Sequence, residues 1–150
     1  MNTSRKILLV EDNADHVYLF MRALRTSGLD IEVDHVPDGR EAVNYLSSRI
    51  HETAENSAQL PKLLLLDIKL PIMTGFDVLH WLSLNPAVSR KTSAILLTTS
   101  EDPEDKEKAR RLRARDYWIK PPNMQGYAQL MSNLKEQLAV PSGAEDSTGW

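Results

Sequence analysis

Residues 63–67 read Leu63-Leu64-Leu65-Leu66-Asp67, four consecutive leucines that stop at a carboxylate. A short uninterrupted apolar run that ends at a polar residue is typical of a strand buried on both faces of a sheet. Similar runs occupy residues 7–10, before Glu11-Asp12, and residues 95–97, before Thr98-Thr99. Strands of this kind predict a parallel sheet with helices packed on both sides.

Two weaker strands complete the sheet. Residues 31–36 alternate apolar and polar side chains, which favours an edge position, and residues 117–119 form a short fifth strand. Apolar residues at helical spacing lie between the strands, as at Val17, Phe20, Met21 and Leu24 ahead of Gly28. Strands that alternate with helices predict an α/β fold of the (βα)₅ type, a doubly wound parallel sheet with right-handed crossovers.

Composition narrows the function classes. The chain has 150 residues, of which 41% are hydrophobic, so it is long enough to bury a core as one domain. The absence of cysteine excludes disulfides and thiolate chemistry, and a net charge of −3 gives no general attraction to nucleic acid. The apolar run at residues 7–10 is too short for a signal-peptide core or a membrane span, so we expect a cytoplasmic protein with no membrane partner.

Domain boundaries follow from polar segments. Residues 1–138 are predicted to form the domain, and residues 139–150, rich in Pro, Gly, Ser and acid, a mobile C-terminal tail. Residues 51–61 form a polar loop. Asp102-Pro103 predicts a helix start, and the arginines that follow at 110, 111, 113 and 115 are interpreted as a solvated helix end rather than a nucleic-acid patch.

Chemistry is expected beyond the carboxyl ends of the strands, where doubly wound sheets bind ligands. Those ends carry Glu11 and Asp12, Asp67, Thr98 and Lys120. Three carboxylates brought together repel one another, and a hard dication such as Mg²⁺ relieves that repulsion. A carboxylate beside a metal ion and a lysine can attack phosphorus, because both cations neutralise phosphoryl oxygens. The residues predicted at the carboxyl ends of the strands therefore indicate an aspartyl-phosphate site.

Each of these residues also has an ordinary structural interpretation. Glu11 and Asp12 could help to start a helix, Thr98 could be a β-branched strand residue, and Lys120 could lie on the surface. Their joint placement at the ends of four parallel strands favours the functional interpretation over these separate ones.

The motifs that carry these residues resemble the receiver domain of response regulators (CheY-like). They are Lys6-Ile-Leu-Leu-Val-Glu-Asp-Asn13, Leu64-Leu-Leu-Asp67-Ile-Lys-Leu-Pro71 with Gly75, Ile95-Leu-Leu-Thr98, and Tyr117-Trp-Ile-Lys120-Pro121. The resemblance covers residues 5 to 138 roughly. It implies a flavodoxin-like sheet with strand order 2-1-3-4-5, and a response regulator of a two-component phosphorelay.

The resemblance also implies roles for single residues. Asp67 would be the phosphoacceptor, modified by a sensor histidine kinase. Mg²⁺ would be bound by Glu11, Asp12, Asp67 and the backbone carbonyl of Lys69. A receiver of this kind is not an enzyme in the usual sense, since it catalyses only its own phosphorylation and slow autodephosphorylation.

Further roles concern the switch that follows phosphorylation. Thr98 and Lys120 would bind the phosphoryl group. The spacing to Lys120 and the end of the apolar run favour Thr98, with Thr99, one position later, as the alternative. Tyr117 would be the aromatic switch residue, and Pro121 would follow a cis Lys120–Pro121 bond. With no output domain after Leu138, the output would be a downstream protein, onward phosphotransfer or a homodimer.

The loop at residues 51–61 and the lack of an effector domain resemble the stand-alone regulators paired with bacterial phytochrome kinases, so a bacteriophytochrome is one expected partner. Two departures from the family stand out. The family often has a glycine before the fifth strand, where the preceding helix ends, and this chain has no glycine at that place, near Arg113. We therefore expect the helix that starts at Asp102-Pro103 to end differently. Lys69, two residues after Asp67, is expected to crowd or pair with the phosphoryl group and slow its hydrolysis.

Three other functions remain as alternatives. A Mg²⁺-dependent phosphohydrolase with an Asp nucleophile commonly carries a second Asp two residues later, where this chain has Lys69. A degenerate receiver acting only as a binding module would have lost Asp12, Asp67, Thr98 or Lys120, and none is lost. A flavin-binding protein of the same fold is disfavoured, because an acidic loop after the first strand repels phosphate.

Overall fold

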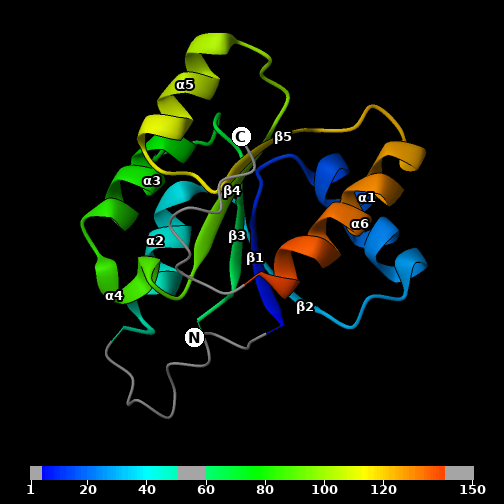
Figure 1. Ribbon diagram of the computed structural model, residues 1–150, viewed down its shortest axis with the longest axis horizontal. Helices are drawn as coiled ribbons and strands as arrows, with labels where there is room; N and C mark the ends of the chain where they lie inside the picture. Colours follow the sequence, from blue (N-terminus) through cyan, green and yellow to red (C-terminus); the bar gives the residue numbers. More distant parts are fainter. Residues whose placement is uncertain (1–4, 51–59, 141–150) are drawn as a thin grey trace.

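The structure is a computed structural model that describes residues 5–50 and 60–140 (Figure 1). Within those residues, five parallel strands form one sheet in the order β2-β1-β3-β4-β5. The strands are β1 Lys6–Val10, β2 Glu32–Val36, β3 Leu63–Leu66, β4 Ser93–Thr98 and β5 Asp116–Ile119. The predicted topology is confirmed, including the edge position of the alternating strand β2.

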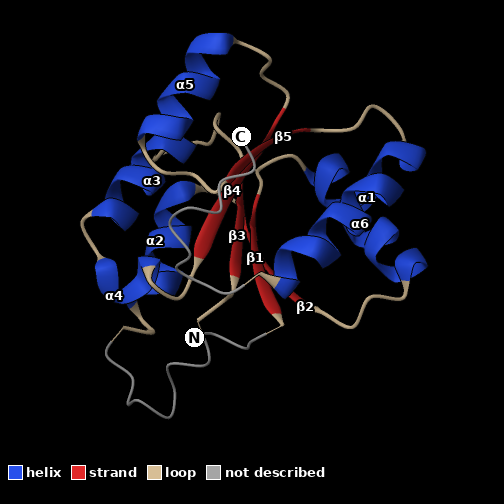
Figure 2. Cartoon of the chain, in the orientation of Figure 1, coloured by secondary structure: helices blue, strands red, loops and turns tan. Residues whose placement is uncertain are grey.

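Helices cover both faces of the sheet (Figure 2). They are α1 Ala14–Ser27, α2 Gly39–Ser47, α3 Gly75–Ser83, α4 Pro86–Ser89, α5 Pro103–Arg111 and α6 Met124–Ala139. Helices α1 and α6 pack together on one face, and α2, α3 and α5 lie on the other. The one-turn helix α4, which starts with Pro86, was not predicted, because four residues are too few to establish a helical period.

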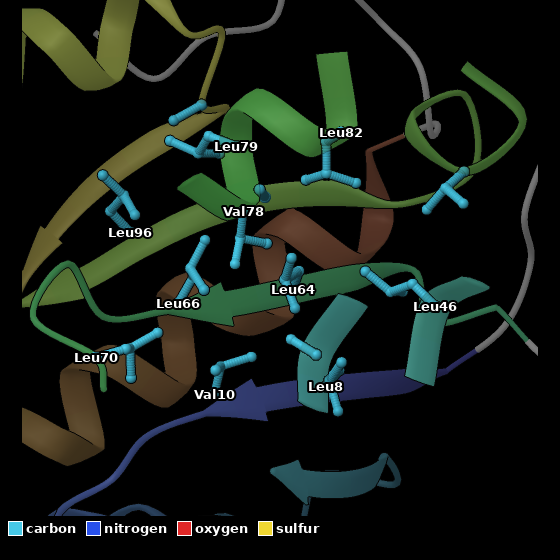
Figure 3. Packing of buried hydrophobic residues seen from close by; sticks show 14 of the residues in the cluster. Leu8, Val10, Leu46, Leu64, Leu66, Leu70, Val78, Leu79, Leu82 and Leu96 are labelled. Atoms are coloured by element: carbon cyan, nitrogen blue, oxygen red, sulfur yellow. The ribbon is translucent and has the colours of Figure 1, made fainter. Parts of the chain in front are cut away.

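The sheet divides the core into two clusters because successive side chains of a strand point to opposite faces. On β1, Leu8 and Val10 join the cluster beneath α2 and α3, seen from close by in Figure 3. Ile7 and Leu9 join the cluster beneath α1 and α6. All four leucines of β3 are 0% exposed. The leucine run that predicted a strand buried on both faces therefore supplies both halves of the core.

Helix ends explain where the loops begin. Asn13 caps α1, its side chain accepting from the amides of Asp15 and His16, and Gly28 ends the helix with φ 71°. Asp102 caps α5 ahead of Pro103, as predicted. These ends set the directions in which the chain returns to the sheet.

The C-terminus of α5 has the left-handed cap that is usually made by glycine. This contradicts the expectation that the helix ends differently because glycine is absent there. Arg113 adopts the left-handed conformation with φ 65°. The amides of Arg113 and Ala114 donate to the carbonyls of Arg110 and Ala109, both at 3.0 Å, which is the Schellman arrangement. Two satisfied carbonyls and the burial of Ala114 offset the roughly 1 kcal/mol cost of a side chain at this φ.

Two predicted segments fall largely outside the described residues. The polar loop at residues 51–61 is described only at Leu60 and Pro61, and the tail at 139–150 only at its first two residues, the first being the end of α6. The domain boundary at 138 stays a prediction. Within the described part of the chain, no helix combines the length and apolarity needed to cross a membrane.

Candidate functional site

The carboxyl ends of four neighbouring strands carry the predicted residues to one edge of the sheet. Glu11 and Asp12 follow β1, Asp67 follows β3, Thr98 ends β4 and Lys120 follows β5. Strand register brings them level, because Val10 pairs with Leu66 and Leu66 with Leu96. The convergence that the sequence predicted is present.

Three carboxylates form the acidic part of the site. Glu11, Asp12 and Asp67 each place one oxygen within 4.8 Å of the other two. Glu11 is 3% and Asp67 8% exposed, whereas Asp12 faces solvent. Negative charges this close repel one another, the more so where burial removes solvent screening. An all-oxygen donor set open to water on one side is what a hard divalent cation such as Mg²⁺ prefers, so these residues fit the predicted metal.

Lys120 balances part of that charge. Its ammonium donates to Asp67 Oδ2 at 2.6 Å and contacts Glu11 Oε1 in a second ion pair. Burial alone lowers the pKa of Lys120, but the hydrogen bonds to Asp67 and Glu11 outweigh it, so the pKa lies above its ordinary value. The site therefore stabilises the charged form of the Lys120 ammonium beside the predicted phosphoacceptor.

Backbone groups fix the carboxylates in place. The second oxygen of Asp67, Oδ1, accepts from the amide of Ile68 at 2.7 Å, and Glu11 Oε2 accepts from the amide of Asn13 at 3.1 Å. His35 Nε2 lies 2.7 Å from the backbone carbonyl of Glu11. Each buried carboxylate is thus oriented by main chain as well as by Lys120, which limits how far it can rotate.

The loop after β3 requires glycine at position 75. A Cβ added to Gly75 would lie 2.2 Å from the carbonyl oxygen of Asp67, and the Gly75 amide donates to Ile68 at 2.8 Å. Lys69, whose carbonyl was predicted as a metal ligand, is exposed in this loop. The close packing of Gly75 explains why the motif around Asp67 extends that far.

Burial separates the two threonines that the sequence left open. Thr98 is 1% exposed and ends β4, whereas Thr99 faces solvent. The carbonyl of Thr98 accepts from the Lys120 amide at 2.8 Å, and its hydroxyl accepts from the Ser100 amide at 3.2 Å. Thr98 is therefore the threonine that belongs to the same buried edge as Asp67 and Lys120.

Tyr117 connects β5 to the loop before α5. Its hydroxyl donates to the carbonyl of Ser100 at 2.7 Å, and the Ser100 hydroxyl donates to Asp105 Oδ2 at 2.6 Å. Burial raises the pKa of Tyr117, so the phenol stays protonated and able to donate. Ser100 thus joins the predicted switch tyrosine to the first turn of α5.

The predicted cis bond before Pro121 is wrong, since the peptide bonds of the described residues are all trans. Trans is the lower-energy form of an X–Pro bond by about 0.5–1 kcal/mol. Lys120 reaches Asp67 and Glu11 with its amide bonded to Thr98, so the site is assembled with the bond in that form.

Two residues near this edge were missed. His16, four residues after Asp12, places Nδ1 3.0 Å from Lys120 Nζ. No local pattern pointed to it, because the contact joins residues 104 positions apart in the chain. Ile72, 71% exposed, has φ 70°, a conformation that is rare for a β-branched residue and gives no signal in the sequence.

Comparison with known proteins gives a consistent result. A family model described as "Response regulator receiver domain" matches residues 7–133. The probable methanogenesis regulatory protein FilR2 of Methanothrix harundinacea (strain 6Ac) is 35% identical over 130 residues, covering 87% of this chain and 81% of FilR2. Response regulator Rcp1 of Synechocystis sp. is 31% identical over 134 residues, covering 89% of this chain and 88% of Rcp1.

Solved structures agree with the sequence matches. The phosphorylated cyanobacterial phytochrome response regulator RcpA superimposes with a TM-score of 0.75 at 33% identity, covering 89% of this chain and 92% of that chain. The Mn²⁺-bound form of Rcp1 gives a TM-score of 0.75 at 28% identity, covering 93% and 99%.

Proposed function

Because this chain belongs to the response regulator receiver domain family of two-component signalling, we propose that it accepts a phosphoryl group on Asp67 from a histidine kinase in a Mg²⁺-dependent reaction. One observation carries the choice of residue. Asp67 follows the central strand β3, between the strand that carries Glu11 and Asp12 and the strand that carries Thr98, and its Oδ2 lies 2.6 Å from the ammonium of Lys120. A nucleophile in that position has positive charge where phosphoryl oxygens would come to rest.

The proposed transfer forms a bond between an Asp67 carboxylate oxygen and phosphorus and breaks the N–P bond of a phosphohistidine, whose imidazole leaves. The carboxylate attacks as the anion, so no proton has to be removed from it. Glu11, Asp12, Asp67 and the carbonyl of Lys69 would hold the Mg²⁺ ion, which would neutralise charge on the carboxylates and the phosphoryl oxygens. The presence of a Mn²⁺-bound form of Rcp1 supports a divalent cation in this family.

Lys120 and Thr98 would receive the new phosphoryl oxygens. Lys120 offers an ammonium and Thr98 a hydroxyl on the neighbouring strand. A new dianionic group beside Thr98 would draw its hydroxyl, and the loop that follows it, toward the phosphoryl group. Tyr117 holds the carbonyl of Ser100 in that loop, so movement there would change the face formed by α5 and β5.

We propose a phytochrome-class histidine kinase as the partner, and a downstream protein, a phosphotransfer partner or a second copy of the chain as the recipient of the signal. RcpA, named as a phytochrome response regulator, supports the kinase class through its similarity over 89% of this chain. Such an exchange would take place in the cytoplasm, where kinase ATP is available.

Intact-mass spectrometry after incubation with acetyl phosphate and Mg²⁺ tests the proposal. We expect wild type to gain the mass of one phosphoryl group, and Asp67→Asn or a chelator to abolish that gain. Asp77→Asn is the matched control, because Asp77 belongs to the capping box of α3 rather than to the acidic cluster. Wild type without an adduct would instead favour a binding module that has lost phosphoryl transfer.

The kinase class is tested separately by phosphotransfer. The labelled phosphoryl group should pass to this chain faster from the phosphohistidine of a purified phytochrome-class kinase than from that of a histidine kinase of another sensor class. Equal rates from both kinases would contradict the partner while leaving Asp67 as the phosphoacceptor.

A further inference from the structure

His16 reaches the site from α1, an element to which the proposed reaction assigns no role. Its Nδ1 lies 3.0 Å from Lys120 Nζ and 3.5 Å from Glu11 Oε1. His16 lies in the first turn of α1, where the Asn13 side chain accepts a hydrogen bond from the His16 amide at 3.2 Å and fixes the backbone that carries the ring. Its side chain is 31% exposed, so it contributes less to the core than to this contact.

Hydrogen-bonding rules decide which atom carries the ring proton. An ammonium has three donor hydrogens and no lone pair, so Lys120 can only donate to Nδ1. A hydrogen bond between these two atoms therefore requires Nδ1 as the acceptor, with the ring proton on Nε2. Asp67, Glu11 and His16 together use all three donor positions of Lys120.

We propose that His16 is a positioning residue, whose neutral imidazole holds the ammonium of Lys120 in line with Asp67 through phosphoryl transfer. The inference rests on the proposed function and adds a residue to it. Of the three acceptors, Asp67 is consumed by the reaction and Glu11 is committed to the divalent cation. His16 is the acceptor that keeps the same partner before and after transfer.

The choice of imidazole over a third carboxylate has an electrostatic consequence. A neutral acceptor orients the ammonium without cancelling its charge, so the full positive charge remains for the phosphoryl oxygens. A carboxylate in the same place would add a negative charge to a cluster that already contains Glu11, Asp12 and Asp67. The incoming phosphoryl group would then meet greater repulsion.

Three substitutions separate positioning from packing. His16→Leu keeps bulk but removes the acceptor, His16→Asn returns an oxygen close to the place of Nδ1, and His16→Gln puts its amide near the place of Nε2. We expect His16→Leu to lower the saturating rate of phosphorylation by acetyl phosphate about tenfold, the effect of one hydrogen bond to a charged group. The KM for acetyl phosphate should change less, because Mg²⁺ and the other site residues are retained.

Rescue decides the assignment. His16→Asn should restore most of the saturating rate and His16→Gln should not, with all variants checked for folding by thermal unfolding. An unchanged rate in His16→Leu, or equal rescue by Asn and Gln, would overturn the inference. Wild type that takes no phosphoryl group at all would overturn the proposed function instead.

A spectroscopic test needs no phosphorylation. Long-range proton–nitrogen NMR of metal-free wild type at neutral pH, with His16 assigned by its absence in His16→Asn, should give a neutral ring with the proton on Nε2. Lys120→Met should alter that Nδ1 resonance. A ring protonated on Nδ1, or a resonance indifferent to Lys120→Met, would rule out the contact on which the inference depends.

Discussion

The amino ends of the parallel strands form one end of the sheet, here called the amino edge, and their carboxyl ends form the opposite, carboxyl edge. Each of these two edges buries a lysine, and the two lysines have different roles. Lys62 precedes β3 at the amino edge and is 9% exposed, and Lys120 follows β5 at the carboxyl edge and is 8% exposed. Lys62 donates to the carbonyl of Leu138 near the end of α6, whereas Lys120 donates to two carboxylates. The first joins a helix end to the sheet, and the second is held beside a reactive group.

Their pKa values move in opposite directions for this reason. Burial lowers the pKa of Lys62, and the positive charges of Arg115 and Arg5 act in the same direction. Burial also lowers the pKa of Lys120, but its bonds to Asp67 and Glu11 reverse the sign. Equal exposure therefore says little about a buried lysine until its partners are known.

The same contrast recurs along β4. Thr92, just before the strand, is 2% exposed, and its hydroxyl donates to the Pro61 carbonyl at 2.6 Å. Thr98, the last residue of the strand, is 1% exposed and accepts a longer bond of 3.2 Å from the Ser100 amide. Thr92 thus joins the start of β4 to the backbone before β3, whereas Thr98 lies beside Asp67 and Lys120 at the carboxyl edge.

The lysine pair gives the largest expected effect. Lys120→Met should lower the rate of phosphorylation by acetyl phosphate about a hundredfold or more, the loss typical of removing a group that stabilises developing charge. Lys62→Met is the matched control and should retain the wild-type rate. Comparable losses in both variants would mean that the two edges are not functionally distinct.

The threonine pair sharpens the contrast between stability and activity. Thr98→Val should slow phosphorylation about tenfold, because one hydrogen bond to a charged group is lost. Thr92→Val should leave that rate unchanged and lower the free energy of unfolding in urea by about 1 kcal/mol. A Thr92→Val variant with impaired phosphorylation but normal stability would break the comparison.

Among residues 5–50 and 60–140, each edge also holds one non-glycine residue with a left-handed backbone, Ile72 at the carboxyl edge and Arg113 at the amino edge. Ile72→Gly and Arg113→Gly should each raise the free energy of unfolding by about 1 kcal/mol, because glycine adopts this φ without steric cost. Arg111→Gly, within α5, is the control and should lower stability. Calorimetry that finds no gain at either position would contradict the assigned conformations.

The pH dependence of stability should show the smallest effect. Lys62 has a lowered pKa when folded, so the unfolded chain binds more protons as pH approaches 10.5, and its contribution to stability should rise with pH. Lys120 has a raised pKa, so its contribution is complete below 10.5 and is lost above it. Urea unfolding of wild type, Lys62→Met and Lys120→Met across this range isolates each lysine by difference.

Much of this molecule could be predicted from short stretches of sequence. The leucine run at 63–66 and the run at 7–10 predicted buried strands, because continuous apolar residues satisfy a sheet covered on both faces. The polar residues that end those runs, Glu11 and Asp67, were placed correctly at one edge, since parallel strands point the same way.

Other features depended on contacts between distant segments. The one-turn helix α4 and the backbone of Ile72 have no periodicity to read. Burial separated Thr98 from Thr99, between which the sequence indicated only a preference. The bond before Pro121 is trans, contrary to the resemblance. His16 meets Lys120 across 104 residues of chain, which no local pattern reports.

The sequence by itself determined the alternation of strands and helices, the edge at which chemistry gathers and the residue types available there, because these follow from local hydrophobicity and strand direction. Only the tertiary structure decided which groups share a proton donor, which lysine is stabilised as a cation and which backbone positions carry strain. Those properties arise from distances of a few ångströms between residues far apart in the chain, and such distances exist only once the two cores have packed.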